Sequence, residues 1–514
     1  MKNFRKVIAV SLCAALSCGL LAGCGGQGTE KGVLTIRYYT GGFGDEWLES
    51  AREKFLAANP DVKDIKLYSD SQLRSTAVTY LTSNTPDIIM SQNLSWASFV
   101  SQGLIEPIDD VYESEVVTSD GNVKIKDYLD DDFAEYGYMQ RIAGQGENHA
   151  WVLPWSVLTC SIAYNVDYLE STPRRSMGAG QYWTEPPATV SELVEYVGDI
   201  NARNDGVVPF SWGGSGYNWL LFPGYVWWAQ IQGVDESKIE GEGSFYDFWE
   251  FQTPEVYKQT GIQGMLNILR DLLVDTDTQS WKNSPDRLEE RDTTDVEKFF
   301  TDGRAAMCFA GSWLENEMDG FIPEGFNMLM MDTPVVDEAY LEKLGIQSTV
   351  DSDVKINNAN AGDVMFIPQK AVNKDIAKRF LTFLCSEEML VEFSEFTGMM
   401  RPFKYNPLEL SDYEFSDFTK SCFSLYMNSD YNLFEYPKNA VKKQQEDPSF
   451  ETYIYTYKRP EIFQEVTLNT AIVKLKTLTG EQIMVTGDSA SSYKSVYDRV
   501  AVEFGKWKAE LGLV

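Results

Sequence analysis

Histidine is the scarcest reactive residue in this sequence, because His149 is the only one among 514 residues. Zinc sites built on histidine draw on several imidazoles, so we expect none of that kind. A Ser-His-Asp triad would have to use His149, and the sequence has no G-x-S-x-G turn to supply its serine. We therefore expect no catalytic residue, no metal and no cofactor.

Basic residues are also scarce. The sequence has 44 Lys and Arg against 77 Asp and Glu, which gives a net charge of −33. Nucleic acids are bound through clustered Lys and Arg, so we expect no nucleic-acid partner. The same balance argues against a body that lies on an anionic membrane. A solvated acidic surface, which keeps an exported protein in solution, explains the excess of carboxylates.

Cysteines are few and far apart. Three of the seven lie within the first 24 residues. The other four are Cys160, Cys308, Cys385 and Cys422. None belongs to a C-x-x-C pair, and each lies in an apolar context that is typical of a buried thiol. Their spacing leaves open whether any two form a disulfide.

Long apolar runs are absent after the N-terminal region. Three basic residues precede an uncharged run at 7–21, and Leu21-Ala22-Gly23-Cys24 follows. This is the layout of a bacterial secretory signal, and the tetrapeptide resembles a lipobox. The run of about 15 residues is shorter than the ~20 that a spanning helix needs. We expect residues 1–23 to be removed and Cys24 to carry a lipid. An ordinary signal peptide and a short membrane anchor are the alternatives.

The roughly 490 remaining residues are enough for two domains. Residues 24–32 are expected to be a lipid-anchored polar linker. Apolar residues alternate over 34–38, which predicts a strand, and an apolar stripe over 47–55 predicts a helix. The continuous apolar run at 87–90 is typical of a buried parallel strand. This β-α-β-α-β order predicts an α/β domain with a parallel sheet.

Several short motifs occur in one order along the chain. They are KFLAANPDV at 54–62, TPDII at 85–89, GLIEPIDD at 103–110, LPWS at 153–156, YNVDYL at 164–169, PPAT at 186–189, FTDGRAAM at 300–307, GSW at 311–313 and AKRFLTFL at 377–384. In this order, behind a lipobox, they resemble the extracellular solute-binding proteins of bacterial ABC importers. Within that family the resemblance is to the carbohydrate-binding group that includes the maltose-binding protein. The region after Arg401 matches less clearly.

The resemblance implies an α/β fold of two lobes, like that of the periplasmic binding proteins, with a hinge and a ligand cleft between the lobes. It places residues 33–153 and 334–398 in the first lobe, and 154–333 and 399–514 in the second. The lobes are then expected to close around the ligand by a hinge motion. The membrane permease of the importer reads the closed form.

A sugar site needs aromatic rings for stacking and planar polar groups for hydrogen bonds. By resemblance, Trp313 is the cleft-lining aromatic residue of the second lobe. Trp155 lies at the lobe crossover, and Trp212 adjoins a Gly-Gly turn at the end of a predicted strand, where α/β sites form. These are the three predicted stacking residues. For any single one of them, packing in the core is the alternative.

Further contacts are predicted around the first lobe. Gln92 and Asn93 match positions where relatives place polar contacts, and Trp96 follows closely. Tyr39 ends the first predicted strand. Arg401 lies in a loop that faces the cleft in relatives, and its alternative is a surface salt bridge. Some relatives have an acidic contact shortly after the crossover proline, where this chain has residues 157–158, Val and Leu. A maltose-type specificity therefore does not transfer.

Several acidic residues are predicted to be structural. Asp87 is expected to anchor local backbone, and the run Asp130-Asp131-Asp132 to be surface charge. Asp275, Asp277 and Gln279 faintly resemble a calcium loop, but the sixth position has no Gly and the twelfth no Glu. We interpret them as a solvated loop.

The predicted function is capture of a carbohydrate, in size an oligosaccharide, by a monomer that performs no chemistry. Its other partners would be the transmembrane subunits of the permease, and the membrane only through Cys24. The expected location is the outer face of the cell membrane of a Gram-positive bacterium. One alternative is the same scaffold binding a polyamine, a peptide or an anion. Another is a secreted glycoside hydrolase, which needs two carboxylates that flank the sugar.

Overall fold

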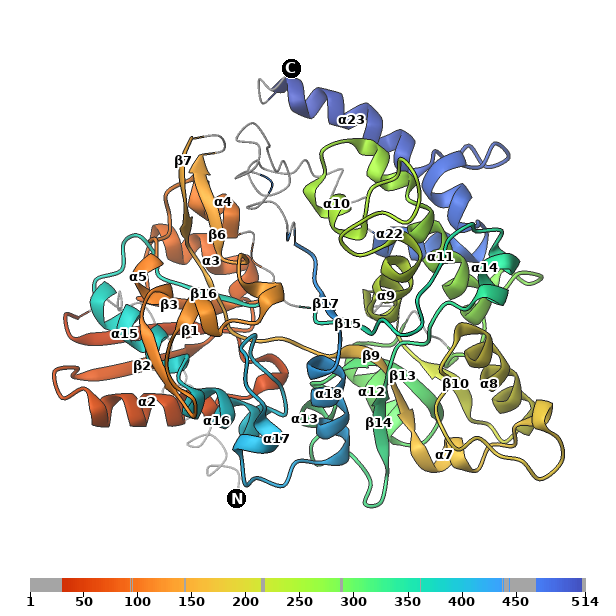
Figure 1. Cartoon of the computed structure of the whole chain (residues 1–514), viewed down its shortest axis with the longest axis horizontal. Coiled ribbons are helices and arrows are strands. Elements are labelled where there is room, and N and C mark those ends of the chain that lie inside the picture. The colour runs from red at the N-terminus through yellow and green to blue at the C-terminus, as the bar shows by residue number, and fades with distance from the viewer. Residues whose placement is uncertain are drawn as a thin grey trace, which may run out of the picture.

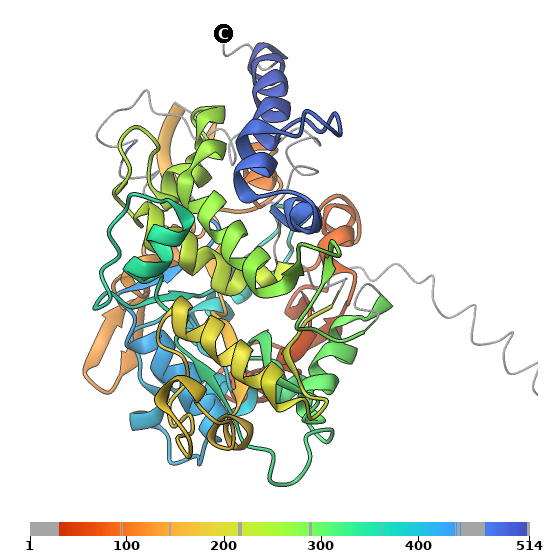
Figure 2. The same cartoon turned by 90° about the vertical axis from the view of Figure 1, so that its right-hand side faces the viewer.

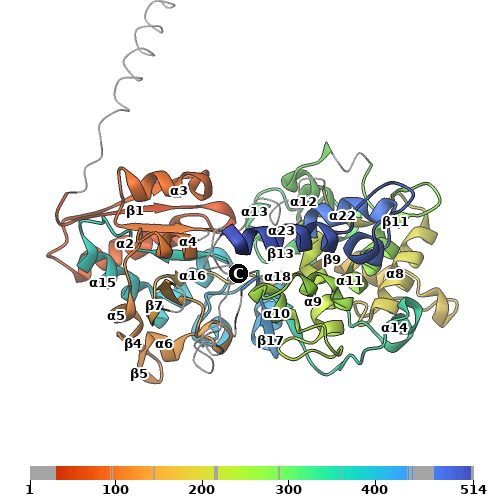
Figure 3. The ribbon, with the colours of Figure 1, turned by 90° about the horizontal axis from the view of Figure 1, so that it is seen from above.

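The computed structural model describes residues 30–510, apart from 93, 95, 143–144, 214–217, 287–289, 361, 437, 439–442 and 444–467. The predicted signal peptide, Cys24 and Asn93 lie outside these residues. The chain forms two lobes side by side, each built around its own sheet (Figures 1 and 3). The prediction of a two-lobe α/β fold is therefore confirmed.

The first sheet has the order β2-β1-β3-β16-β8. Its strands are β1 (Val33–Tyr38), β2 (Asp64–Ser69), β3 (Ile88–Ser91), β8 (Leu153–Pro154) and β16 (Val364–Phe366). β1 runs parallel to β2 and β3, whereas β16 is antiparallel to both of its neighbours. Helix α2 (Glu46–Ala58) connects β1 to β2, and α3 (Leu73–Thr82) connects β2 to β3. The predicted β-α-β-α-β order is confirmed.

Shorter elements complete the first lobe. Its other helices are α4 (Trp96–Ser101), α5 (Asp109–Tyr112), α6 (Ile125–Tyr128), α15 (Lys374–Leu384), α16 (Glu387–Thr397) and α17 (Pro407–Leu410). Its hairpins pair β4 (Glu115–Thr118) with β5 (Gly121–Lys124) and β6 (Tyr138–Ile142) with β7 (Gln145–Ala150). One-turn helices are η1 (Gly41–Phe43) and η2 (Asp131–Phe133). The first of these, directly after β1, lies at the contact between the lobes.

The second sheet has the order β10-β13-β9-β15-β17, and β14 also pairs with β9. Its strands are β9 (Cys160–Asn165), β10 (Val208–Ser211), β13 (Ala305–Gly311), β14 (Met328–Met331), β15 (Ile356–Asn358) and β17 (Tyr431–Leu433). Every residue of β13 is buried, as expected of a central strand that is covered on both faces.

Helices surround the second sheet (Figure 2). They are α7 (Val166–Glu170), α8 (Val190–Arg203), α9 (Leu221–Gln232), α10 (Phe245–Glu250), α11 (Thr260–Leu273), α12 (Thr293–Thr301), α13 (Leu314–Glu317), α14 (Glu338–Leu344), α18 (Asp417–Met427), α22 (Leu468–Ile472) and α23 (Val496–Glu510). Shorter pieces are η3 (Arg175–Met177), η5 (Pro254–Lys258), η7 (Val473–Lys476), η8 (Gln482–Thr486), β11 (Val274–Asp275) and β12 (Ser280–Trp281). All residues of α9 are buried, so this helix is the centre of the lobe.

Two segments cross between the sheets, one from β8 to β9 and one from β15 to β16, and residues 398–405 run beside them ahead of α17. Backbone hydrogen bonds join them side by side. The amide of Val157 donates to the carbonyl of Met400 over 2.9 Å, and the amide of Leu158 donates to that of Ala359 over 2.9 Å. A hinge made of three joined strands can bend without letting the lobes come apart.

The return from the second lobe to the first differs from the expectation. We expected it near Pro334, but residues 334–358 stay with the second lobe, and the first sheet resumes at β16. The Pro334 carbonyl accepts the indole N–H of Trp227 on α9, at 2.9 Å. The amide of Val335 donates to the carbonyl of Ala188, ahead of α8. These bonds turn the chain back across its own lobe, where β15 joins the second sheet.

Two further findings concern the whole described chain. No helix within it combines the length and the apolar composition that crossing a membrane requires. Cys160, Cys308, Cys385 and Cys422 are all buried free thiols, which answers the question that their spacing left open. Burial raises the pKa of the Cys385 thiol to about 11, so that it stays protonated and unreactive.

Candidate functional site

The lobes touch where η1 of the first lobe meets α13 of the second. The side-chain amide of Asn316 donates to the carbonyl of Gly42. A Cβ atom on Gly42 would lie 3.0 Å from Cγ of Glu317 and 3.0 Å from Cβ of Trp313. Glycine at position 42 therefore permits the close approach of the two lobes.

Trp313 lies on the second-lobe side of this contact, directly before α13, and is partly exposed. Its ring packs edge-on against Trp219, at 5.8 Å between centroids, and against Phe222, at 5.6 Å. Its indole N–H donates to Oε1 of Glu297 over 3.1 Å. Two ring contacts and one hydrogen bond fix the orientation of the indole, which is the preorganisation that a binding surface needs.

Glu297 and Glu317 form a carboxyl pair beside this indole. Glu297, on α12, is buried, and its Oε2 atom has no hydrogen-bond partner among the described residues. Burial raises the pKa of Glu297, and the neighbouring charge of Glu317 raises it further. Glu317 ends α13 and is exposed at the edge of the contact. Desolvation raises its pKa as well. We conclude that Glu297 holds its proton at neutral pH.

Asp363 brings a third carboxyl to the site, from the second crossing segment. It is only 4% exposed, and its Oδ2 accepts the hydroxyl of Ser156 over 2.6 Å. Burial raises the pKa of Asp363 to about 7, although the hydrogen bond from Ser156 acts to lower it.

Tyr39 contributes a phenol from the first lobe, just ahead of η1. It follows β1, its amide donates to the carbonyl of Met90 over 3.0 Å, and its side chain is half-buried. Burial raises the pKa of Tyr39, and the charges of Glu317 and Asp363 raise it further. The phenol thus lies within electrostatic range of carboxyls from the second lobe and from the hinge. No Lys or Arg of the described chain forms an ion pair with Glu297, Glu317 or Asp363.

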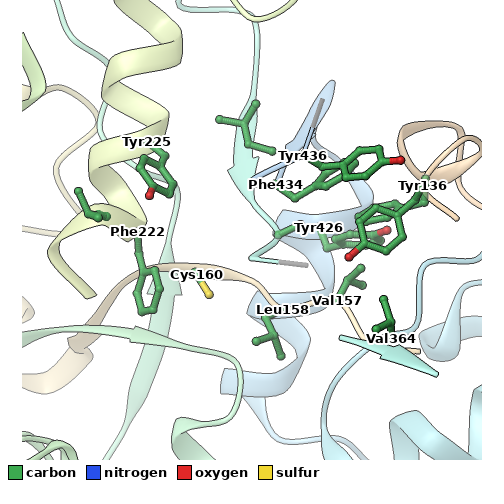
Figure 4. Close-up of a cluster of buried hydrophobic side chains, with 14 of the residues drawn as sticks. Tyr136, Val157, Leu158, Cys160, Phe222, Tyr225, Val364, Tyr426, Phe434 and Tyr436 are labelled. Atoms are coloured by element: carbon green, nitrogen blue, oxygen red, sulfur yellow. The ribbon is translucent and has the colours of Figure 1, made fainter. Parts of the chain in front are cut away.

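Aromatic side chains from both lobes face one another above the crossing segment (Figure 4). Phe222 and Tyr225 of α9 lie on one side, Tyr136 and Tyr436 lie on the other, and residues 157–160 run between them. The ring centroids of Tyr136 and Tyr436 are 4.8 Å apart. Rings from both lobes therefore face one another across the crossing segment.

The segment 431–436 links the lobes beside these rings. Its first half is β17 of the second sheet, whereas Phe434 stacks on Phe133 of the first lobe at 4.5 Å between centroids. The phenol of Tyr225 donates to Oε1 of Glu435 over 2.5 Å. This segment is therefore packed against both lobes.

The predicted contact residues fall into two groups. Trp313, Tyr39 and Gln92 are partly exposed, and Trp313 lies at the interlobe contact. The buried group is Trp155, Trp212, Trp96 and Arg401, with exposed fractions of 1%, 0%, 3% and 1%. The structure uses the second group in packing, where no ring face is open to a ligand. A role for the first group in ligand binding stays a prediction.

The buried tryptophans belong to three separate aromatic clusters. Trp155 lies 4.7 Å from Phe43 and 5.8 Å from Trp47 between ring centroids. Trp212 meets Trp281 edge-on at 4.8 Å. Trp96 stacks on Tyr436 at 6.4 Å. A role for these three in ligand binding stays a prediction, and for Trp155 and Trp212 the core alternative describes what the structure shows.

Arg401 is neither exposed nor in a surface salt bridge. Its Nε atom donates to the carbonyl of Trp155 over 3.1 Å, and Nη1 donates to the carbonyl of Leu384. Desolvation lowers the pKa of this guanidinium. Arg401 therefore ties residues 398–405 to the first crossing segment and to the end of α15.

Two interpretations of acidic residues have different outcomes. Asp87 is confirmed as a backbone anchor, because it accepts the amides of Thr35, at 2.9 Å, and Asn373, at 2.8 Å. The run at 130–132 is not simply surface charge. Asp130 accepts the phenol of Tyr426 over 3.1 Å, and Asp132 pairs with a Lys of the C-terminal segment. Two of the three aspartates therefore join the lobes.

The loop at Asp275 is a hairpin turn. Oδ1 of Asp275 accepts the amides of Asp277, at 2.9 Å, and Thr278, at 3.2 Å. Within the described ranges, no three or more His, Cys, Asp or Glu side chains gather in a way that could hold a metal ion. The side chain of Asp275 is thus used by its own backbone.

Sequence reasoning missed the three carboxyls of the site. Glu297 had a usable signal, since it lies three residues before buried Phe300 on the apolar stripe of α12. A charged residue in such a stripe is rarely buried without a reason. Asp363 had no local signal, because its hydrogen-bond partner is 207 residues away in the sequence. Glu317 is exposed, and only its place against Gly42 makes it notable.

Comparison with known proteins agrees with this architecture. The family of bacterial extracellular solute-binding proteins matches residues 40–390. RafE, solved in complex with raffinose, is 16% identical, with a TM-score of 0.58 over 92% of this chain and 100% of RafE. GacH of Streptomyces glaucescens, solved unliganded and with acarbose, is 12% identical, with a TM-score of 0.58 over 92% and 97%.

A third structure, a family 1 extracellular solute-binding protein from Bifidobacterium longum subsp. infantis, is 16% identical. Its TM-score is 0.55 over 93% of this chain and 99% of its own. A search of curated protein sequences gave no match. At these identities the solved structures are similar to this chain in fold.

Proposed function

The chain belongs to the bacterial extracellular solute-binding proteins, and from that premise we propose that it captures a carbohydrate between its lobes. The proposed ligand has the size of an oligosaccharide. The lobes close on it, and the closed form delivers it to the transmembrane subunits of an ABC importer. The protein binds its ligand and does not convert it.

The observation that carries this proposal is Trp313 at the interlobe contact. A partly exposed indole, fixed by Trp219, Phe222 and Glu297, offers the apolar surface on which the CH face of a sugar stacks. Carboxyls and phenols around it supply hydrogen bonds for hydroxyl groups. The raffinose bound to RafE and the acarbose bound to GacH support a sugar ligand here.

We also propose that Cys24 carries a lipid that holds the protein on the outer face of a Gram-positive cell membrane. The leader and the small residues before Cys24 support this. A tether raises the concentration of the binding protein beside its permease without any new contact. The protein would act as a monomer, and the lipid would be its only membrane contact.

A thermal-shift screen of the full chain against a panel of oligosaccharides tests the function. We expect a rise in Tm with one class of sugar and no release of reducing ends. Turnover of any glycan would overturn the binding role in favour of a glycoside hydrolase. A response to a peptide or an anion, with none to sugars, would overturn the carbohydrate assignment.

The lipid is tested separately. We expect cells fed a palmitate analogue to label the wild-type protein and not a Cys24→Ala variant. The variant should appear in the medium. Labelling of the variant would refute the role of Cys24.

A further inference from the structure

We infer that a groove on the first lobe docks a segment of a partner protein, one that carries Lys or Arg beside apolar side chains. The groove has a volume of about 840 Å³. Its lining residues come from α2, α15, α16, α17 and the β4–β5 hairpin, all of the first lobe (Figure 1). The inference goes beyond the proposed function, because it concerns a partner that binds to one lobe alone.

The first argument is that the lining of the groove is apolar and open to solvent. Val117, Phe396 and Leu410 line it, and their exposed fractions are 69%, 45% and 38%. Phe383 and Val391 add partly buried apolar surface. The three exposed side chains come from β4, α16 and α17, so the fold gathers them from distant parts of the sequence. An exposed apolar surface with a polar rim is typical of a protein interaction site.

The second argument is the length of the groove. Glu388, Glu392 and Phe396 of α16 all line it, and a spacing of four places them on one face of the helix. From the first to the last of them the helix rises about 12 Å. The other face of α16 packs inward, where the ring of Phe393 meets Trp155 edge-on at 6.3 Å. The groove is therefore long enough for several residues of a peptide rather than for one side chain.

The third argument is the charge of the rim. Four of the lining residues are glutamates and one is a lysine. Lys54 pairs with Glu388 at 2.6 Å and with Glu392 at 2.7 Å. The other two glutamates accept hydrogen bonds from neutral donors, as Glu387 does from the amide of Ser119 over 2.8 Å. A cation brought by a partner would form charge-assisted hydrogen bonds with these carboxylates.

The combination of apolar lining and acidic rim decides between possible occupants. An anionic membrane surface or a nucleic acid would be repelled by the glutamates. A second copy bound through the same face would place the glutamates of both copies opposite one another. A protein segment with apolar side chains and Lys or Arg complements both parts of the groove.

The test uses three short fluorescent peptides, whose binding to the full chain is measured by anisotropy at neutral pH and physiological salt. The first alternates Leu with Lys, the second Leu with Glu, and the third Ser with Lys. An extended peptide places alternate side chains on opposite faces, and long Lys side chains can bend back to the rim. We expect the Leu-Lys peptide to bind about ten-fold or more tightly than either of the others, because only it gains both apolar burial and ion pairs.

Two matched double variants locate the binding. Glu395→Gln combined with Phe396→Ser changes one acid and one exposed ring of the groove, and should weaken the Leu-Lys peptide about ten-fold. Glu324→Gln combined with Phe321→Ser makes the same changes at exposed positions of the second lobe, and should leave binding unchanged. Val117→Ser, on a different element of the groove, should also weaken binding and decides the matter if the first variant does not fold.

The outcomes are distinct. Equal binding of the Leu-Lys and Ser-Lys peptides, or an equal loss in both double variants, would show attraction to the acidic surface at large and overturn the inference. Self-association of the full chain that the groove variant abolishes would replace the partner segment with a second copy. Because the groove belongs to one lobe, we expect the same peptide affinity with and without a bound sugar. An affinity that changes with the sugar would overturn the assignment to this groove, and carbohydrate capture would stand in every case.

Discussion

The two lobes contribute different things to the site between them. The first lobe presents a glycine turn whose backbone approaches the partner, with Gly42 accepting a hydrogen bond from Asn316. The second lobe presents the indole of Trp313 and the carboxyl of Glu317 on and before one short helix. The first lobe thus leaves space for the close approach of the second, and the second supplies the aromatic ring and the carboxyl. Substitutions in the first lobe should therefore weaken binding by hindering the close approach of the lobes. Substitutions in the second lobe should weaken it by removing side chains that contact the ligand.

Trp313→Ala should have the largest effect, because it removes the main apolar surface on the second-lobe side. We expect affinity for the identified ligand to fall about 100-fold, as for a central aromatic contact. Trp313→Phe should lose less, since a ring remains. Calorimetry gives the affinity and thermal unfolding checks that the fold is intact. Unchanged affinity would remove Trp313 from the site.

Gly42→Ala tests fit on the first-lobe side. Its Cβ would lie 3.0 Å from Glu317 and Trp313, so closing the lobes would require overpacking that costs about 1–3 kcal/mol. We expect affinity to fall about ten-fold with little change in Tm. Gly505→Ala on α23 is the control, because a Cβ there meets nothing within 4 Å. If both variants bind like the wild type, the close approach at Gly42 has no role in closure.

Asp363→Asn tests the hinge carboxyl through pH. Burial raises its pKa from 3.8 to about 7, so the folded state binds a proton more tightly than the unfolded state. The stability that this group contributes is complete below pH 3.8 and is lost as pH rises through about 7. Chemical unfolding across this window should show a decline in the wild type that the variant reduces by roughly 1 kcal/mol or more. Parallel pH profiles would contradict the shifted pKa.

Tyr225→Phe should have the smallest effect. It removes the hydrogen bond to Glu435, which joins α9 of the second lobe to the segment that packs on the first. We expect a loss of about 1 kcal/mol in the free energy of unfolding, measured with denaturant. A larger loss with unchanged ligand affinity would show that this segment serves stability rather than binding.

Much of the first lobe was predictable because its signals are local. Alternation over β1, the stripe on α2 and the apolar run at β3 are each contained within a few residues, and the structure matches them. Asp87 was recognisable as an anchor for the same reason. The error at Pro334 arose because the course of the chain there depends on Trp227, more than a hundred residues earlier.

The site was less predictable, because burial is a property of the assembled core. Trp155 and Trp313 look alike in sequence, each beside a serine at the end of a motif. The first is covered by Phe43, Trp47 and Phe393 from distant parts of the chain, whereas the second stays partly open. The burial of Asp363 likewise depends on contacts with residues far away in the sequence, which no local sequence pattern indicates.

The position of β1 has a mechanical consequence. It lies between β2 and β3 in parallel register, and Asn373 clamps its start by accepting from the amide of Gly32 at 2.8 Å and donating to the carbonyl of Val33 at 2.9 Å. A pull on the chain ahead of Glu30, along the strand, would load these bonds together in shear rather than peel them one at a time. Such a pull would therefore act on the first lobe as one rigid unit, and it would not load the hinge, which stays free to bend.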